Sequence, residues 1–136
     1  MELRRGQVAV VTGGASGIGL ALAESMAHAG LSIVLADVQT DALAAAEKRI
    51  GDLGVEVLSV RTDVSKEADV QALAAATLER FGAPQVVCNN AGVGGAGDPW
   101  FGPLATWDWS WASTSGAWST ACGRFFPTCS KEAATS

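Results

Sequence analysis

Short apolar runs alternate along this chain with longer segments in which apolar residues recur every three or four positions. The runs, rich in β-branched residues, occupy positions 7–12, 31–36, 55–60 and 85–89. Continuous runs of this length are typical of strands buried on both faces of a parallel sheet. The intervening segments are 17–29, 41–53 and 65–81. Their period predicts three helices between four strands.

Residues at the ends of these segments support the helix predictions. Gly30 follows the first helix as an expected C-terminal cap, and Thr40 or Asp41 is an expected N-cap of the second. Acidic Glu67 and Asp69 lie in the expected first turn of the third helix, where their negative charges interact favourably with the positive end of the helix dipole.

The alternation predicts an α/β fold, a doubly wound parallel sheet with helices on both faces. We expect one domain over residues 1–109, incomplete after the fourth strand. Residues 110–136 are rich in Ser and Thr and show neither a helical nor a strand period. They are expected to form an aberrant, poorly ordered tail.

Composition narrows the function class. The formal net charge of −5 and the pI near 4.7 argue against nucleic acid or an anionic membrane as partner. No apolar run approaches the roughly 20 residues that span a bilayer, and the first residues do not resemble a cleavable signal. We expect a cytoplasmic protein that acts on a small molecule.

Cysteine and histidine give no sign of a metal site. Cys88, Cys122 and Cys129 lack metal-ligand spacing, and Cys88 lies in an apolar run where a buried thiol is ordinary. His28 is the only histidine and lies late in the first helix. We expect it to stabilise the negative end of the helix dipole and not to act in catalysis.

The loop Thr12–Gly19 joins the first strand to the first helix. Gly13, Gly17 and Gly19 allow a sharp turn and a close approach to a phosphate, and Ser16 and Ile18 lie between them. Backbone amides and the positive end of the helix then form an anion site. We predict that a dinucleotide pyrophosphate binds here, although such turns also occur for packing alone.

Asp37 ends the second strand, 18 residues after Gly19. A carboxylate at this point of a dinucleotide fold accepts hydrogen bonds from the adenosine ribose. It repels a 2′-phosphate, and no Arg lies in the glycine loop or directly after Asp37, so NAD is favoured over NADP. The alternative role is that of a strand-end or capping residue.

Three motifs resemble the short-chain dehydrogenase/reductase family. Its glycine motif, T-G-x-x-x-G-x-G, is matched by Thr12, Gly13, Gly17 and Gly19. Asp63-Val64 is similar to the adenine-contacting Asp-Val pair of the family. The N-N-A-G motif is matched by Asn89, Asn90, Ala91 and Gly92. The resemblance covers roughly residues 6–109 and implies a Rossmann-like domain that binds NAD(P).

The resemblance implies hydride transfer between nicotinamide and a small alcohol or carbonyl substrate. The family uses a Tyr four residues before a Lys as general acid and base, but this chain has no Tyr, and Pro127 lies four residues before Lys131. No motif assigns Ser113 or Ser119 to the role of the family's serine. We therefore expect cofactor binding without catalysis.

Residues after Trp109 depart from the family. Trp107 resembles the start of the family's next helix, but the apolar pattern of that helix is lost after Trp109. If one guanine is restored to a suitable back-translation of the following residues, the new reading frame encodes an apolar run that contains the Asn expected from the family. We therefore expect a frameshift, with oligomer contacts in doubt; the alternative is a divergent natural tail. Trp100 and Phe101 precede it, where they could contact substrate or pack the loop.

Two other functions stay open. A non-catalytic dinucleotide-binding or regulatory module would need an ordered tail with a partner-binding face. An enzyme completed by a second chain would take its Tyr and Lys from that chain.

Overall fold

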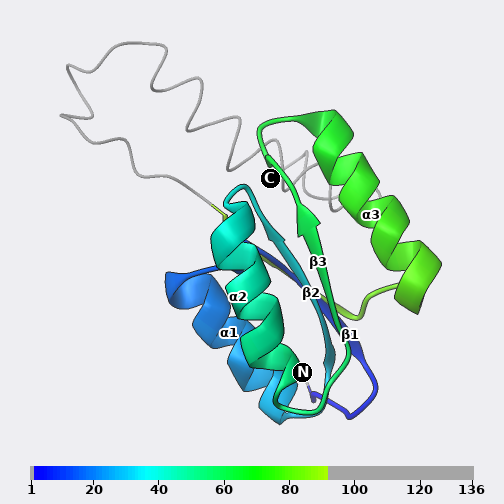
Figure 1. The fold of residues 1–136 in the computed structure, drawn as a ribbon. Helices are drawn as coiled ribbons and strands as arrows, with labels where there is room; N and C mark the ends of the chain where they lie inside the picture. The colour runs from blue at the N-terminus through cyan, green and yellow to red at the C-terminus, as the bar shows by residue number, and fades with distance from the viewer. Residues whose placement is uncertain (1, 92–136) are drawn as a thin grey trace, which may run out of the picture.

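A computed structural model describes residues 2–91 of the chain (Figure 1). Strands and helices alternate throughout this part. In chain order they are β1 (Val8–Thr12), α1 (Gly17–His28), β2 (Ser32–Asp37), α2 (Thr40–Gly51), β3 (Val57–Arg61), α3 (Glu67–Phe81) and β4 (Val86–Asn89). The predicted element order is confirmed.

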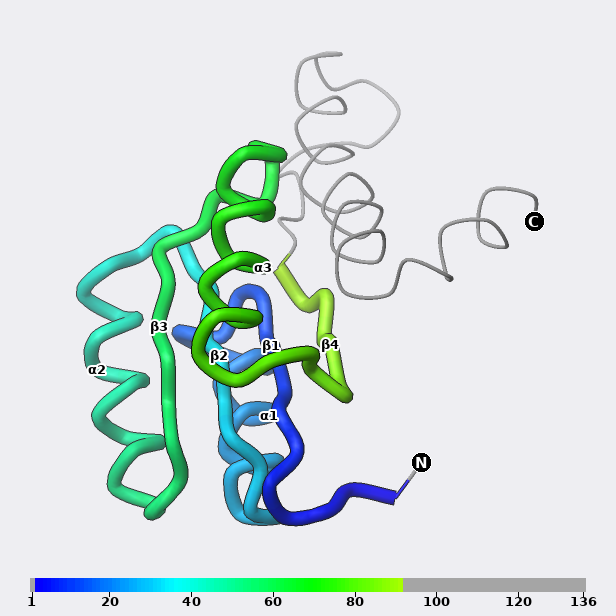
Figure 2. Tube along the Cα trace, turned by 90° about the vertical axis from the view of Figure 1, so that its right-hand side faces the viewer, coloured from blue at the N-terminus to red at the C-terminus, as the bar shows by residue number. Residues whose placement is uncertain are grey.

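The four strands form one parallel sheet in the order β3-β2-β1-β4. Figure 2 shows β3 and β4 as the outer strands, with β2 and β1 between them. Because every strand runs the same way, the four carboxyl ends lie at one edge of the sheet. That edge carries the glycine loop after β1, the Asp63-Val64 turn after β3 and the segment after β4.

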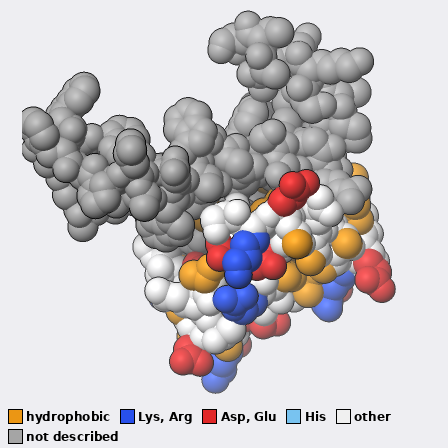
Figure 3. Space-filling view, turned by 90° about the horizontal axis from the view of Figure 1, so that it is seen from above, with side chains coloured by type: hydrophobic (Ala, Val, Ile, Leu, Met, Phe, Trp, Pro, Cys, Tyr) orange, Lys and Arg blue, Asp and Glu red, His pale blue; other side chains and the backbone are white. Residues whose placement is uncertain are grey.

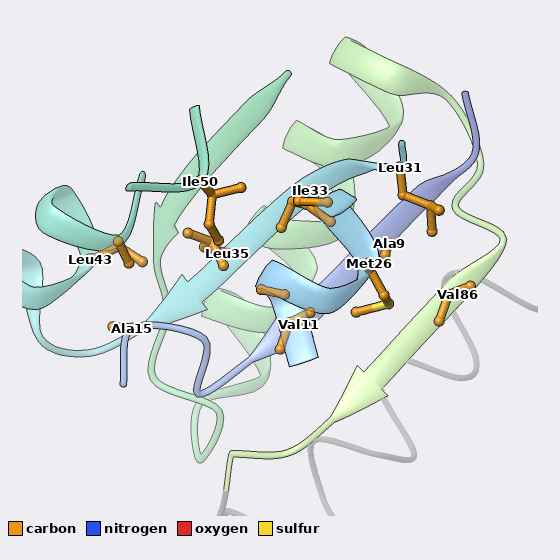
Figure 4. Packing of buried hydrophobic residues seen from close by; sticks show 13 residues of the cluster. Ala9, Val11, Ala15, Met26, Leu31, Ile33, Leu35, Leu43, Ile50 and Val86 are labelled. Carbon is orange, nitrogen blue, oxygen red and sulfur yellow. The ribbon is translucent and has the colours of Figure 1, made fainter. Parts of the chain in front are cut away.

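Two apolar layers cover the two faces of the sheet. On one face α1 and α2 pack against alternate strand residues, and Figure 4 shows this cluster, which includes Val11, Met26, Ile33, Leu35 and Ile50. On the other face α3 packs through Val70, Leu73 and Ala74 against Val10 and Val34. The central strands are buried on both faces, which explains why their sequences are continuously apolar.

The end of α1 agrees with the prediction for Gly30. This residue has φ +92° and donates its N–H to the Ala27 carbonyl, while Leu31 N–H reaches the Met26 carbonyl. Such a pair of bonds is a Schellman motif, in which glycine adopts the left-handed conformation without a Cβ penalty.

Other boundaries differ from the prediction by one or two residues. Gln39 is the N-cap of α2, so the expectation of Thr40 or Asp41 was wrong. The helix starts early because Asp37 holds the Gln39 N–H and closes the turn before it. Likewise α3 begins at Glu67 and not at Ser65, because Ser65 is hydrogen-bonded to Asp63 in a turn.

Residues 2–91 contain neither a candidate membrane-spanning helix nor a candidate metal site. No helix there is long and apolar enough to cross a membrane. No group of three His, Cys, Asp or Glu side chains in that part could hold a metal ion. The predictions for Gly92, Trp100, Phe101, the two later cysteines and the tail at 110–136 lie outside the described residues.

Candidate functional site

The last residues of neighbouring strands lie side by side at the carboxyl edge of the sheet. In the sheet register Thr12 pairs with Ala36 and with Asn89, and Asp37 pairs with Arg61. Figure 3 views the molecule from this edge and shows acidic and basic side chains next to one another among apolar ones. The sheet thus gathers the predicted site residues from four separate segments.

Gly13 and Gly19 are needed because the loop folds tightly on itself. A Cβ on Gly19 would lie 2.1 Å from the Gly13 carbonyl oxygen and 2.6 Å from Asn90 Nδ2. Gly13 has φ +64°, and a Cβ there would lie 3.0 Å from Ala91 Cα. No side chain larger than hydrogen fits at residue 19 without moving backbone. These two glycines bring the start of α1 against β1 and the loop after β4.

Gly17 has a different reason to be glycine. Its φ is +57°, yet no atom of residues 2–91 outside its own neighbourhood lies within 4 Å of a Cβ built on it. It is the first residue of α1, preceded by the exposed N-cap Ser16, which makes no side-chain cap hydrogen bond. The neighbouring Ile18 side chain is 74% exposed. The start of this helix is therefore open on the outside.

The first turn of α1 also lacks an acidic side chain of its own. Its first turn contains no acidic residue, whereas α2 has Asp41 and α3 has Glu67 and Asp69 in theirs. The first N–H groups of a helix have no intrahelical acceptor, and the helix dipole makes this end positive. An open, uncapped helix start beside a glycine turn fits an anion such as a pyrophosphate.

Thr12 ties this loop to the segment after β4. Its side chain is buried, and its hydroxyl donates to the Cys88 carbonyl at 3.3 Å. The same oxygen accepts the N–H groups of Asn90 and Ala91, each at 3.1 Å. Asn90 completes the link by donating Nδ2–H to the Gly13 carbonyl at 3.4 Å. The T-G and N-N-A-G motifs are thus parts of one structure.

Asp37 has two contacts that sequence alone did not predict. Its Oδ2 accepts the Ala15 N–H at 3.2 Å, and its Oδ1 accepts the Gln39 N–H at 3.1 Å. The half-buried carboxylate therefore fixes the glycine loop against the end of β2 and closes the turn into α2. These two hydrogen bonds hold the negative charge of Asp37 beside the loop, where the ribose contact is predicted.

Asp63 is held within its own turn. Its Oδ1 accepts the hydroxyl of Ser65 at 2.6 Å and the Ser65 N–H at 3.0 Å, and its own N–H donates to Asp69 at 2.9 Å. The Ser65 hydroxyl bond lowers the pKa of Asp63, partial burial opposes this, and Lys66 and Arg61 add smaller lowering effects. Val64 follows, half-buried, so the Asp-Val pair flanks the site from β3.

Cys88 and Asn89 are the last two residues of β4 and lie at the carboxyl edge of the sheet. Among the described residues none donates a hydrogen bond to the buried Oδ1 of Asn89. Cys88 packs at the border of the core that α1 and α2 cover, and burial raises the pKa of its thiol. The expectation of a largely buried thiol is thus met in part, because Cys88 is half-buried.

Sequence reasoning missed two residues of this edge. Gly14 is buried, and a Cβ there would lie 2.8 Å from Leu35 and 3.0 Å from the Val11 carbonyl oxygen, so it packs the loop onto the sheet. Arg61 is the register partner of Asp37 and brings a cation to the site. The usual strand order of a Rossmann-like sheet would have indicated Arg61, because β3 lies next to β2 in such a sheet.

Comparison with known proteins gives one consistent family. Residues 7–112 match the short chain dehydrogenase family. The 1-deoxy-11-beta-hydroxypentalenate dehydrogenase of Streptomyces avermitilis is 47% identical over 98 residues, which cover 71% of this chain and 36% of that protein. The 3beta-hydroxysteroid dehydrogenase 2 of Eggerthella lenta is 39% identical over 88 residues, which cover 65% of this chain and 34% of that protein.

Solved structures of related proteins contain either nicotinamide cofactor. A short chain dehydrogenase/reductase from Burkholderia phymatum in complex with NAD has 43% identity and a TM-score of 0.87, covering 93% of this chain and 45% of its own. L-Sorbose reductase from Gluconobacter frateurii, complexed with NADPH and L-sorbose, has 34% identity and a TM-score of 0.87, covering 93% and 49%. The chain thus spans about a third of these curated relatives and about half of these structures.

Proposed function

Because this chain belongs to the short chain dehydrogenase family, we propose that residues 1–109 form an NAD(P)-binding domain of a hydride-transferring oxidoreductase. The proposed cofactor site consists of the glycine loop and the strand ends beside it. Its residues are Thr12, Gly13, Ser16, Gly17, Ile18, Gly19, Asp37, Asp63, Val64, Asn89, Asn90, Ala91 and Gly92. For an intact member of the family, the proposed substrate is a small alcohol or carbonyl compound.

One observation carries the proposal. Gly17 opens an uncapped helix whose first turn has no acidic side chain, and the space where its Cβ would point is empty of described atoms. A pyrophosphate fits this arrangement because it needs N–H donors, a positive helix end and close access to the backbone. When bound, a nicotinamide dinucleotide supplies the carbon centre that gives or accepts a hydride. The residues of this chain bind and orient it.

Asp37 supports NAD as the preferred form. Its carboxylate is fixed by two backbone N–H groups, so its charge stays beside the loop. A fixed carboxylate accepts hydrogen bonds from ribose hydroxyls and repels a 2′-phosphate. The related structures with NAD and with NADPH show that the family uses both, so the preference of this chain depends on such local charges.

Isothermal titration of the chain with NAD and NADP tests the proposal. We expect NAD to bind more tightly than NADP, and D37A to weaken NAD by about tenfold or more, since a hydrogen bond to a charged group is lost. The ratio of the two affinities should fall, because the repulsion of the 2′-phosphate is lost with the carboxylate.

A matched control separates charge from general disturbance. Asp52 is an exposed C-cap of α2, so D52A should leave both affinities unchanged. A D37A protein that binds NAD as the wild type does would refute the role of Asp37. Equal loss of NAD and NADP would assign Asp37 to loop structure alone.

We further propose that this chain by itself does not turn over substrate. The family's general acid and base is a tyrosine, and the sequence contains none. Assays with NAD and a panel of alcohols should show binding without reduction of the cofactor. Turnover that appears only after a second polypeptide is added would favour the completed-enzyme alternative.

The origin of residues 110–136 is tested by the gene. Sequencing should reveal a single-base change that opens a frame running on to Tyr-x-x-x-Lys. If none exists, the frameshift hypothesis is wrong. Protease resistance of residues 110–136 would then favour the regulatory module, and a cytoplasmic location stays part of either proposal.

A further inference from the structure

The outer strand β3 ends in a cation beside the proposed adenosine site. Arg61 is its last residue, and its register partner on β2 is Asp37. Two positions earlier, Leu35 packs in the cluster under α1 and α2, while its partner Ser59 donates to Glu47 of α2. Because strand residues two apart share a face, Asp37 and Arg61 are rooted on that same face. Neighbouring strands lie about 4.8 Å apart.

The guanidinium group of Arg61 is weakly held. Its Nη1 lies 3.9 Å from Asp69 Oδ2, and its side chain is 56% exposed. The same Asp69 oxygen accepts the Asp63 N–H at 2.9 Å, which is the shorter contact. An exposed ion pair at this distance contributes little, so Arg61 can turn toward a new partner at small cost.

Asp37 does not form an ion pair with Arg61 within the described residues. The carboxylate oxygens of Asp37 accept the N–H groups of Ala15 and Gln39, and no Asp37–Arg61 ion pair forms within residues 2–91. The edge thus places a fixed anion and a reorientable cation on adjacent strands, with opposite effects on a phosphate.

We propose that Arg61 is a second determinant of cofactor specificity, as the group that binds the 2′-phosphate of NADP. The inference rests on the proposed function. A guanidinium group binds phosphate oxygens through charge-assisted, bidentate hydrogen bonds. The charge of Asp37 opposes the phosphate and Arg61 attracts it, so the balance between these two residues sets the preference. NAD lacks the phosphate and does not use Arg61.

A double-mutant cycle measures this balance. Wild type, D37N, R61Q and D37N/R61Q are titrated with NAD and NADP by calorimetry. D37N should bind NADP about tenfold more tightly than wild type, because removing one charge removes the repulsion. Adding R61Q should reduce this affinity about fivefold to tenfold, as expected for loss of a charge-assisted bond at a partly exposed site. NAD affinity should change less than twofold when R61Q is added.

Two further variants serve as controls. D37N/R61K keeps a cation and should retain part of the NADP affinity that D37N/R61Q loses. Arg80 lies exposed in the last turn of α3, away from the carboxyl edge, so R80Q removes the same charge without touching the site. It should leave both affinities unchanged.

Several outcomes would overturn the inference. It is wrong if D37N and D37N/R61Q bind NADP equally, if R61Q weakens NAD as much as NADP, or if D37N binds NAD but no NADP. Absence of dinucleotide binding by the wild type and every variant would refute the proposed function itself, and this inference with it.

Discussion

Two turns at the carboxyl edge, β1–α1 and β3–α3, join a strand to a helix in opposite ways. In the β3–α3 turn Asp63 accepts two hydrogen bonds from Ser65, Asp69 accepts the Asp63 N–H, and acidic residues occupy the first helical turn. Within residues 2–91 neither N-cap, Ser16 of α1 or Lys66 of α3, makes a side-chain cap hydrogen bond, so the difference at the helix start is one of charge: the first turn of α1 has no acidic residue.

The difference separates a helix start that is stabilised by its own acidic residues from one that has none. Asp63 holds the turn that leads into α3, and the charges of Glu67 and Asp69 offset the positive dipole at the start of the helix, so this turn stabilises itself. The start of α1 forgoes this stabilisation and stays available to an external anion. Glycines maintain the opening, because Gly19 lets the helix approach and Gly17 leaves space outside it.

Gly19→Ala should break the β1–α1 turn with the largest effect. The added Cβ would meet the Gly13 carbonyl oxygen at 2.1 Å, which forces backbone to move. Overpacking of this kind costs about 3 kcal/mol, so the urea midpoint should fall strongly and NAD binding should be lost.

Gly51→Ala is the matched control for that substitution. Gly51 ends α2, and in the described part of the chain no neighbouring atom lies within 4 Å of its Cβ position. Alanine there should leave stability unchanged or raise it by about 0.5 kcal/mol. If Gly19→Ala unfolds at the wild-type urea concentration, the close packing of this turn is wrong.

Gly17→Ala should have an intermediate effect on stability and a specific effect on binding. Its φ of +57° strains any residue with a Cβ, at a cost of about 1 kcal/mol. The methyl group would occupy the open space at the start of α1, so NAD affinity should fall about tenfold, a loss of roughly 1.4 kcal/mol. Urea unfolding and calorimetry measure the two effects.

Gly54→Ala is the matched control, because it adds a methyl group at a glycine of positive φ that lies away from the proposed site. Gly54 has φ +86° and an equally open Cβ position, and it lies in the loop before β3 at the other end of the sheet. It should lose similar stability and bind NAD normally. Equal NAD affinity in both variants would contradict an anion site at Gly17.

Ser65→Ala tests the self-contained β3–α3 turn and should have the smallest effect. The Ser65 hydroxyl lowers the pKa of Asp63 from its ordinary value of 3.8 in the folded protein. A lowered folded pKa stabilises the fold above the unfolded value, and this stabilisation is lost as pH falls through the folded value. Near pH 6 we expect the variant to be less stable by about 0.5–1 kcal/mol.

The pH dependence provides the check on Ser65→Ala. The difference in unfolding free energy between wild type and variant should shrink below about pH 4, as Asp63 becomes protonated. Urea titrations between pH 3 and pH 6 measure it. A difference that stays constant over this range would show that Ser65 acts without the Asp63 charge.

Much of the fold could be predicted from the local pattern of apolar residues and glycines along the sequence. The buried strands predicted a parallel sheet because each is apolar on both faces, and Gly30 predicted the end of α1 because only glycine adopts φ +92° freely. Boundaries near Asp37 and Asp63 were less predictable. There, side-chain hydrogen bonds to Gln39 and Ser65 decide which residue begins the helix.

The sequence by itself determined the element order, the family and the residues of the glycine loop, since these depend on periodicity and on contiguous motifs. Only the tertiary structure decided that Thr12 links two motifs, that Gly19 contacts the loop after β4, and that Arg61 lies beside Asp37. These contacts join residues 24 to 79 positions apart, as with Thr12 and Ala91 at the upper end. Their pairing depends on strand order and register, which packing of the whole sheet selects.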